Sequence, residues 1–127
     1  MRPFILALCA ASGACAPEPS SAVATAGAGT ADPLSCALTV RFGSYAMGID
    51  AGTAERVEQL LRADRSVGSV ERRPWGKEGE VDLCAQVQRA GDAARLFERI
   101  RPLLPPKPRG PIIVSLADGR QYQVPPS

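Results

Sequence analysis

Apolar residues occupy every second position in two stretches of the chain, which is typical of a β-strand with one buried face. In residues 36–42 the side chains predicted to point inward are Cys36, Leu38, Val40 and Phe42. In residues 80–87 they are Val81, Leu83, Ala85 and Val87. The same alternation directs Cys84 outward, to the face opposite the one predicted for Cys36.

Three further strands are shorter or weaker in their pattern. Residues 66–73 contain two valines and end in three charged residues, which indicates a strand at the edge of a sheet. Residues 112–116, apolar apart from Ser115, are also predicted to be a strand. Residues 121–124 follow it after Asp118-Gly119, a pair that is typical of a hairpin turn.

Two segments between the strands have apolar residues at helical spacing. The first begins at about Thr53, the predicted N-cap, and ends at Asp64. The second begins near Asp92, also a predicted cap, and ends at about Pro102, because proline does not suit a helix interior. The predicted buried stripes are Ala54, Val57, Leu60 and Leu61 in the first helix, and Ala93, Leu96, Phe97 and Ile100 in the second.

The order of these elements is β-α-β-β-α-β-β over residues 34–127, which we predict to be a single small α+β domain. The economical packing for this order is ferredoxin-like. In that arrangement a right-handed split β-α-β unit places two helices on one face of an antiparallel sheet. The last hairpin adds an extra C-terminal strand.

The first residues of the chain have the features of a secretory signal. Arg2 is basic, residues 4–11 are apolar, and small residues follow up to Ala14. The apolar run is far shorter than the ~20 residues of a membrane-spanning helix. Residues 1–14 are therefore predicted to be a signal peptide.

The residues at the end of this signal, Ser12-Gly13-Ala14-Cys15, resemble the lipobox of bacterial lipoproteins, with Ser12 in place of the usual aliphatic residue. The resemblance implies a diacylglyceryl thioether and an N-acyl group such as palmitate on Cys15, and hence membrane attachment. Ala16 in place of Asp implies sorting to the outer membrane, facing the periplasm. The alternative is cleavage beyond Cys15, which would leave a soluble periplasmic or secreted protein.

Residues 16–33 consist almost entirely of Ala, Pro, Ser, Gly and Thr. Such a segment cannot bury enough apolar surface to offset backbone ordering, so it is predicted to be a flexible linker. A coil of this length spans roughly 20–25 Å root-mean-square. The lipidated cysteine and its linker are thus expected over residues 15–33, ahead of the domain.

Composition excludes several classes of function. The 15 Lys and Arg nearly balance the 13 Asp and Glu, and aromatic residues make up 5%, which argues against a nucleic-acid-binding protein. The absence of histidine excludes Ser-His-Asp and Cys-His catalysis as usually built, and removes the commonest metal ligand. We therefore expect no enzyme activity, no cofactor and no metal site.

Four cysteines are present, but Cys9 lies within the predicted signal peptide and Cys15 directly follows it. No C-x-x-C pair points to zinc, and two cysteines in an exported domain most often form a disulfide, here Cys36 with Cys84. Their opposite predicted faces leave three possibilities. Cys36 precedes the regular strand, a bulge reverses its direction, or the thiols stay unbonded.

Two segments carry candidate contact residues. Residues 43–52 contain three glycines ahead of a predicted helix, which fits either a generic anion site or a simple connection that needs positive φ. Residues 72–80 form a turn in which Trp75 is flanked by the cations Arg72, Arg73 and Lys77. Trp and Arg are common in binding hot spots, so this turn is a candidate contact for a glycan or a protein. Alternatively, Trp75 folds back over the sheet edge.

The run from Val40 to Tyr45, followed by a helix with Ala54 and Leu60-Leu61, a strand and a second Ala/Leu-rich helix, resembles the sporulation-related (SPOR) peptidoglycan-binding domains of bacterial envelopes. The resemblance covers residues 38–104. It implies a β-α-β-β-α-β module that binds glycan strands lacking stem peptides. The cysteine pair and the terminal hairpin depart from that family's pattern.

These observations lead to three hypotheses. The first is an envelope-anchored bacterial lipoprotein whose domain is a binding or accessory module, for example for another envelope protein. The second is peptidoglycan binding. The third is an enzyme based on carboxylates such as Asp50 and Glu78, which requires them to converge in one pocket. The candidate contacts for a ligand or partner are Arg41, Tyr45, Arg72, Trp75 and Lys77.

Overall fold

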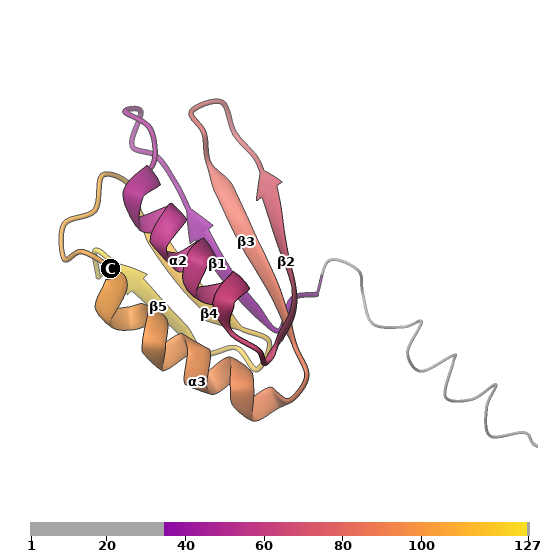
Figure 1. The fold of residues 1–127 in the computed structure, drawn as a ribbon. Coiled ribbons are helices and arrows are strands. Elements are labelled where there is room, and N and C mark those ends of the chain that lie inside the picture. Colours follow the sequence, from indigo (N-terminus) through magenta and orange to yellow (C-terminus); the bar gives the residue numbers. More distant parts are fainter. Residues whose placement is uncertain (1–34, 127) are drawn as a thin grey trace, which may run out of the picture. The chain divides into compact units, whose positions relative to one another are not determined.

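A computed structural model describes residues 35–126 of the chain (Figure 1). The predicted signal peptide, the lipidation site Cys15 and the linker lie outside these described residues.

The observed elements follow the predicted order. They are β1 (Leu38–Phe42), α2 (Ala51–Ala63), β2 (Val67–Pro74), β3 (Val81–Val87), α3 (Ala90–Ile100), the 3₁₀ turn η1 (Arg101–Leu103), β4 (Ile112–Leu116) and β5 (Gln121–Val124). The strands form one sheet in the order β2-β3-β1-β4-β5, and every neighbouring pair is antiparallel. The α+β class and the ferredoxin-like arrangement with an added strand are confirmed. β2 lies at an edge, as predicted.

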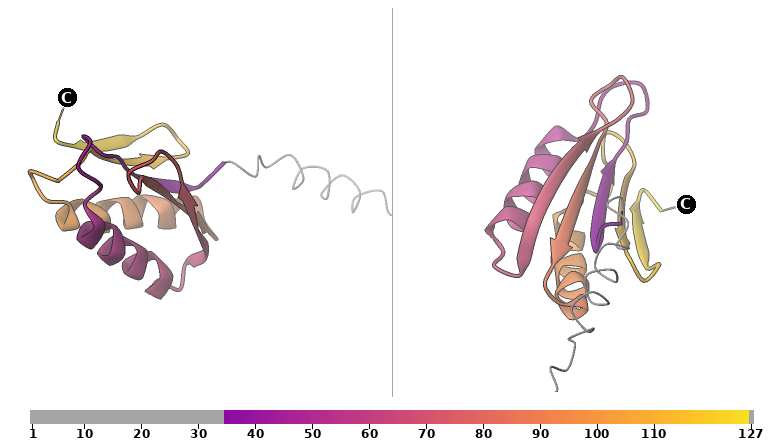
Figure 2. Two further views of the ribbon diagram at one scale, coloured as in Figure 1. Left: turned by 90° about the horizontal axis from the view of Figure 1, so that it is seen from above. Right: turned by 90° about the vertical axis from the view of Figure 1, so that its right-hand side faces the viewer.

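Both helices cover the same face of the sheet (Figure 2). The alternation read from the sequence decides which side chains face them, because successive strand residues point to opposite faces. Leu38, Val40 and Phe42 of β1 are fully buried under the helices. Burying side chains of this size contributes about 1.5–3 kcal/mol each. Within residues 35–126 the core therefore lies on one side of the sheet, and no helix of this part of the chain covers the other face.

The predicted helix stripes are confirmed almost completely. Ala54, Val57 and Leu61 of α2 are buried, and Leu60 is partly buried against the same core. The whole predicted stripe of α3 is buried, namely Ala93, Leu96, Phe97 and Ile100.

The predicted N-caps were wrong by three residues in both helices. α2 is capped by Asp50, whose Oδ1 accepts a hydrogen bond from the Thr53 amide at 3.3 Å. Thr53 is fully buried, and its hydroxyl accepts from Arg56 instead. α3 has Arg89 at its N-cap, so Asp92 lies in the first turn. A carboxylate is favoured there by the helix dipole as well as at the cap, which is why the sequence pattern misplaced the start.

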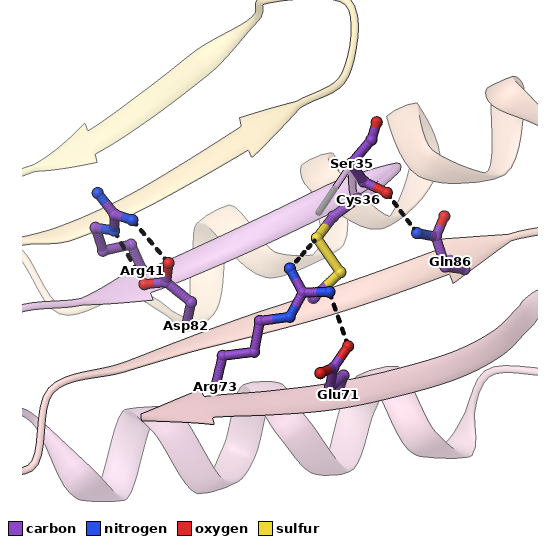
Figure 3. The surroundings of a disulfide bond; sticks show 8 residues. Ser35, Cys36, Arg41, Glu71, Arg73, Asp82 and Gln86 are labelled. Carbon is purple, nitrogen blue, oxygen red and sulfur yellow. Dashed lines mark hydrogen bonds and ion pairs between the residues drawn. A yellow bond between two sulfur atoms is a disulfide. The ribbon is translucent and has the colours of Figure 1, made fainter. Parts of the chain in front are cut away.

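A disulfide joins Cys36 to Cys84 across a Cα–Cα distance of 5.4 Å, as predicted (Figure 3). Cys36 precedes β1, which begins at Leu38, so the strand alternation does not govern its direction. The inward placement of Cys36 was therefore wrong, and the first of the three possibilities applies. A cross-link that closes a loop of 48 residues contributes about 3–4 kcal/mol.

Asp64, the C-cap of α2, connects the two helices. Its carboxylate accepts from Arg99 at 2.6 Å and from Arg95 at 3.1 Å, both on α3. It also accepts from the Ser66 amide at 2.9 Å and hydroxyl at 2.6 Å. The hydrogen bonds from Arg95 and Ser66 hold the pKa of Asp64 well below its ordinary value.

We predict that Asp64→Asn lowers the free energy of unfolding by about 1 kcal/mol at pH 7. The figure is small because Arg95 and Arg99 are about half exposed and solvent screens their ion pairs. Since the pKa is depressed in the folded state, the contribution is complete above the unfolded pKa of about 3.9 and is lost as the pH falls below it. Denaturant unfolding at several pH values measures this. An equal loss at pH 3 and pH 7 would contradict the assignment.

The matched control is Glu98→Gln. Glu98 is 62% exposed and pairs with Arg101 at 3.2 Å, beyond the first turn of α3, so its substitution should change stability much less.

Candidate functional site

The helix-free face of the sheet is polar and ordered in rows that cross the strands. Directly paired residues share a face, so the register defines these rows. Two rows cross the middle of the sheet, each with one residue from every strand. The first consists of Glu71, Cys84, Thr39, Ser115 and Gln121. The second consists of Arg73, Asp82, Arg41, Ile113 and Gln123. Most of these side chains are exposed or half-buried. We refer to this surface as the helix-free face.

Three side chains form a connected group on this face, which we call the Trp75 cluster: Arg41, Trp75 and Asp82. Asp82 accepts two hydrogen bonds from Arg41, at 2.9 and 2.7 Å, and a third from the indole Nε1 of Trp75 at 2.8 Å. The Arg41 guanidinium lies over the Trp75 ring, 5.2 Å from its centroid. The hydrogen bonds that Arg41 donates to Asp82 raise the pKa of Arg41, so its guanidinium stays charged. One carboxylate therefore fixes both a cation and an aromatic ring.

Trp75 remains 41% exposed despite these contacts. Arg41 contacts one part of the ring and Asp82 holds its polar edge, so Trp75 is held against the sheet without being covered. A rigid and partly exposed aromatic ring loses little conformational entropy when a ligand binds, which is typical of an anchor residue.

The disulfide borders the same face (Figure 3). Arg73 Nη1 lies 3.5 Å from Cys36 Sγ, and Arg73 Nη2 pairs with Glu71 at 2.8 Å. The hydrogen bond from Arg73 lowers the pKa of Glu71. The Gln86 amide donates to the Ser35 carbonyl at 2.6 Å. These contacts fix Ser35 and Cys36 to the helix-free face beside β2 and β3.

Two loops lie together at one end of the sheet, residues 43–50 after β1 and residues 75–80 between β2 and β3; we call them the paired loops. The Ser44 hydroxyl donates to Glu78 Oε2 at 2.6 Å and joins them. The same hydroxyl oxygen accepts from the amides of Ala46 and Gly48, each at 3.0 Å. Both loops are therefore held by internal hydrogen bonds.

The base of the first loop is fixed by a close backbone approach. The Gly43 amide donates to the Pro111 carbonyl at 2.8 Å. A Cβ atom on Gly110 would overlap the carbonyl of Gly43, so glycine is required where the segment before β4 crosses this loop.

The structure separates the predicted contact residues into two groups. Arg41 and Trp75 lie together on the helix-free face, and Tyr45 and Lys77 lie on the adjoining paired loops. Arg72 pairs with Leu83, whose side chain is buried, and binds Glu58 of α2 at 2.6 Å, so it points to the helix side. The folding-back of Trp75 over the sheet and its role as a contact are both compatible with this geometry.

The sequence reasoning missed Asp82, the residue that organises the cluster. A signal for it existed. Asp82 alternates outward in β3, and the predicted ferredoxin-like order makes β3 and β1 neighbours, so a carboxylate opposite Arg41 was foreseeable. The exact register was needed to see it.

The two carboxylates proposed for catalysis have separate structural partners. Asp50 caps α2 and also accepts from the Arg109 amide at 3.4 Å. Glu78 accepts from Ser44 in the paired loops. Among residues 35–126, no three Cys, Asp or Glu side chains gather closely enough to hold a metal ion. The same part of the chain contains no helix long and apolar enough to cross a membrane.

A small hollow of about 120 Å³ lies at the opposite end of the sheet from the paired loops. Four alanines line most of it: Ala37 just before β1, Ala90 and Ala93 in α3, and Ala117 in the β4–β5 turn. Leu116, Asp118 and Arg120 complete the lining. Its size suits a single apolar side chain rather than a small-molecule substrate.

Comparison with protein-family models, curated proteins and solved structures gave no match to this chain.

We predict that Asp82→Leu frees the ring of Trp75. The chain's single tryptophan is Trp75, so fluorescence reports on this site alone. Loss of the acceptor for Nε1 should increase quenching of Trp75 by acrylamide and lower the free energy of unfolding by about 0.5–1.5 kcal/mol. Glu71→Leu, on the same face but bound to Arg73, should leave the quenching unchanged. Equal quenching in both variants would show that Asp82 does not hold the ring.

Proposed function

We propose that this chain is a bacterial envelope lipoprotein whose domain is a non-catalytic binding module, with the helix-free face around the Trp75 cluster as its contact surface. The observation that carries the proposal is the cluster itself. Asp82 accepts hydrogen bonds from both Arg41 and Trp75, while Trp75 stays 41% exposed. Preorganised aromatic and arginine side chains are the usual anchors of binding surfaces.

The partners of the charged groups support binding rather than catalysis. The cation of Arg41 and the carboxylates of Asp50, Glu78 and Asp82 each have hydrogen-bond partners that fix the domain. A catalytic acid or base has to be positioned toward a substrate and needs a pKa near the working pH.

The membrane localisation of the module is proposed from the signal-like residues 1–14 and the lipobox resemblance at Cys15. Two or more acyl chains give stable membrane anchoring, since each buried methylene contributes about 0.8 kcal/mol. The linker over residues 16–33 would then hold the domain near the outer membrane on its periplasmic side.

The test of the anchor is mass spectrometry of the chain purified from the membrane fraction of a bacterial host. We expect a mature protein that begins at Cys15 and carries acyl groups. Cys15→Ser should leave the precursor unprocessed and remove the added mass. A wild-type chain that begins after residue 15 and carries no lipid would refute the anchor.

A specific observation favours glycan as the ligand class. The rows of the helix-free face cross five strands and present hydroxyl, amide and charged groups beside the partly exposed ring of Trp75. Five strands at about 4.8 Å spacing give a polar track roughly 19 Å long, which suits an extended sugar chain. The resemblance of residues 38–104 to peptidoglycan-binding modules points to the same ligand.

Retention of the chain on purified peptidoglycan sacculi tests this candidate. Trp75→Ala and Asp82→Leu should each weaken retention by about tenfold, the effect of removing a hot-spot anchor. Arg72→Ala is the matched control, because Arg72 points to the helix side and should not affect retention. Wild-type protein that fails to bind sacculi would exclude glycan but not a protein partner.

A further inference from the structure

The large apolar side chains that the described residues expose gather at one end of the sheet. They are Met47, 77% exposed, Tyr45, 58% exposed, and Trp75, 41% exposed. Met47 and Tyr45 lie on the first of the paired loops, and Trp75 begins the second. Figure 1 shows these loops beside each other at the upper end of the sheet. No other part of the described chain presents apolar side chains of this size to solvent.

The backbone holds these side chains outward. Ala46, between Tyr45 and Met47, has a φ of +84°, in a region that a residue with a Cβ atom seldom adopts. The Ser44 hydroxyl accepts the amides of Ala46 and Gly48, and Ile49 is buried and fixes the loop from below. A strained residue that the surrounding contacts maintain, with two exposed apolar neighbours, indicates a functional use for the projection.

We propose that the paired loops form a membrane-contact tip, in which Tyr45 and Met47 enter the headgroup region of a zwitterionic lipid surface and Trp75 lies at its border. Tyr and Trp favour this interfacial depth because each combines an apolar ring with a polar group. The backbone amides nearest the tip already have acceptors in Ser44 and Glu78, so entry leaves few of them without a partner.

The size of the tip favours a membrane over a protein partner. Three partly exposed side chains fall well short of the ~800 Å² that each partner contributes to a stable protein interface. A chain that is already anchored needs far less surface, because its second membrane contact is intramolecular. In this respect the inference rests on the proposed lipid anchor.

The position of the tip suits the predicted linker. The described chain begins at Ser35, just before β1, whereas the tip follows the far end of β1. Eight residues, 36–43, separate them, a length of about 26 Å in extended backbone. The linker predicted over residues 16–33 has a root-mean-square span of roughly 20–25 Å, and a tethered contact is most effective when span and linker length match.

The net charge of the paired loops favours a zwitterionic lipid surface over an anionic one. The paired loops carry one cation, Lys77, against three carboxylates, Asp50, Glu78 and Glu80. An excess of negative charge opposes anionic lipids, so contact should weaken as anionic lipid is added.

The experiment couples the chain from Cys15 onward, through the Cys15 thiol, to a maleimide headgroup lipid in vesicles. This chain contains every described residue, and the coupling replaces acylation, so failure of lipidation in cells does not affect the result. The reporter is Met47→Trp combined with Trp75→Phe, measured with brominated phosphatidylcholine as a quencher. The matched control is Gln121→Trp with Trp75→Phe, which places an exposed indole near the opposite end of the sheet.

We expect strong quenching of the reporter at position 47, little quenching at position 121, and weaker quenching at 47 when anionic lipid is included. In the chain with native Trp75, vesicles should shift the emission to shorter wavelength, and Tyr45→Ser with Met47→Ser should abolish the shift while circular dichroism confirms folding.

An unquenched reporter at 47, equal quenching at 121, or quenching that grows with anionic lipid overturns the proposal. Loss of a co-purifying protein in Met47→Ser, with no lipid quenching of the reporter, would identify a protein partner instead and also overturn it.

Discussion

The antiparallel register between β1 and β3 is the constraint on which the remaining features depend. It pairs Val40 with Leu83 beneath the helices and Arg41 with Asp82 on the opposite face. Because side chains alternate along a strand, a slip of one residue would bring polar groups into the core and apolar groups to the surface. The buried face thus fixes the register, and the register then determines which polar groups meet on the helix-free face.

The fold was predictable from the sequence because its alternation and helical stripes are strong. The strands around Val40 and Leu83 and the helices around Leu61 and Leu96 all lie where the pattern placed them. Local details were less accessible. Cys36 follows the alternation in sequence but precedes the strand, and Asp50 and Thr53, three positions apart, are both suitable caps. Such choices depend on hydrogen bonds that form only when the chain has folded.

The candidate site was predictable in its residue types but only partly in its geometry. Arg41 and Trp75 were identified as contacts, yet their common partner Asp82 was not, because a cross-strand pair requires the register. Arg72 was grouped with them by proximity in sequence. It points to the other face because it is paired with the inward Leu83. Every second residue of a strand lies on the same face of the sheet, whereas direct neighbours in sequence lie on opposite faces.

The cross-link between Cys36 and Cys84 also has a mechanical consequence. If the domain is held through residues 16–33, any tension on that segment enters the domain at residue 36 and passes through a covalent bond to the middle of β3. The hydrogen bonds of β1 are then not peeled apart one after another from their exposed end. The disulfide would therefore raise the force that the domain withstands while it holds a ligand. In a reducing compartment the same force would act first on the hydrogen bonds of β1.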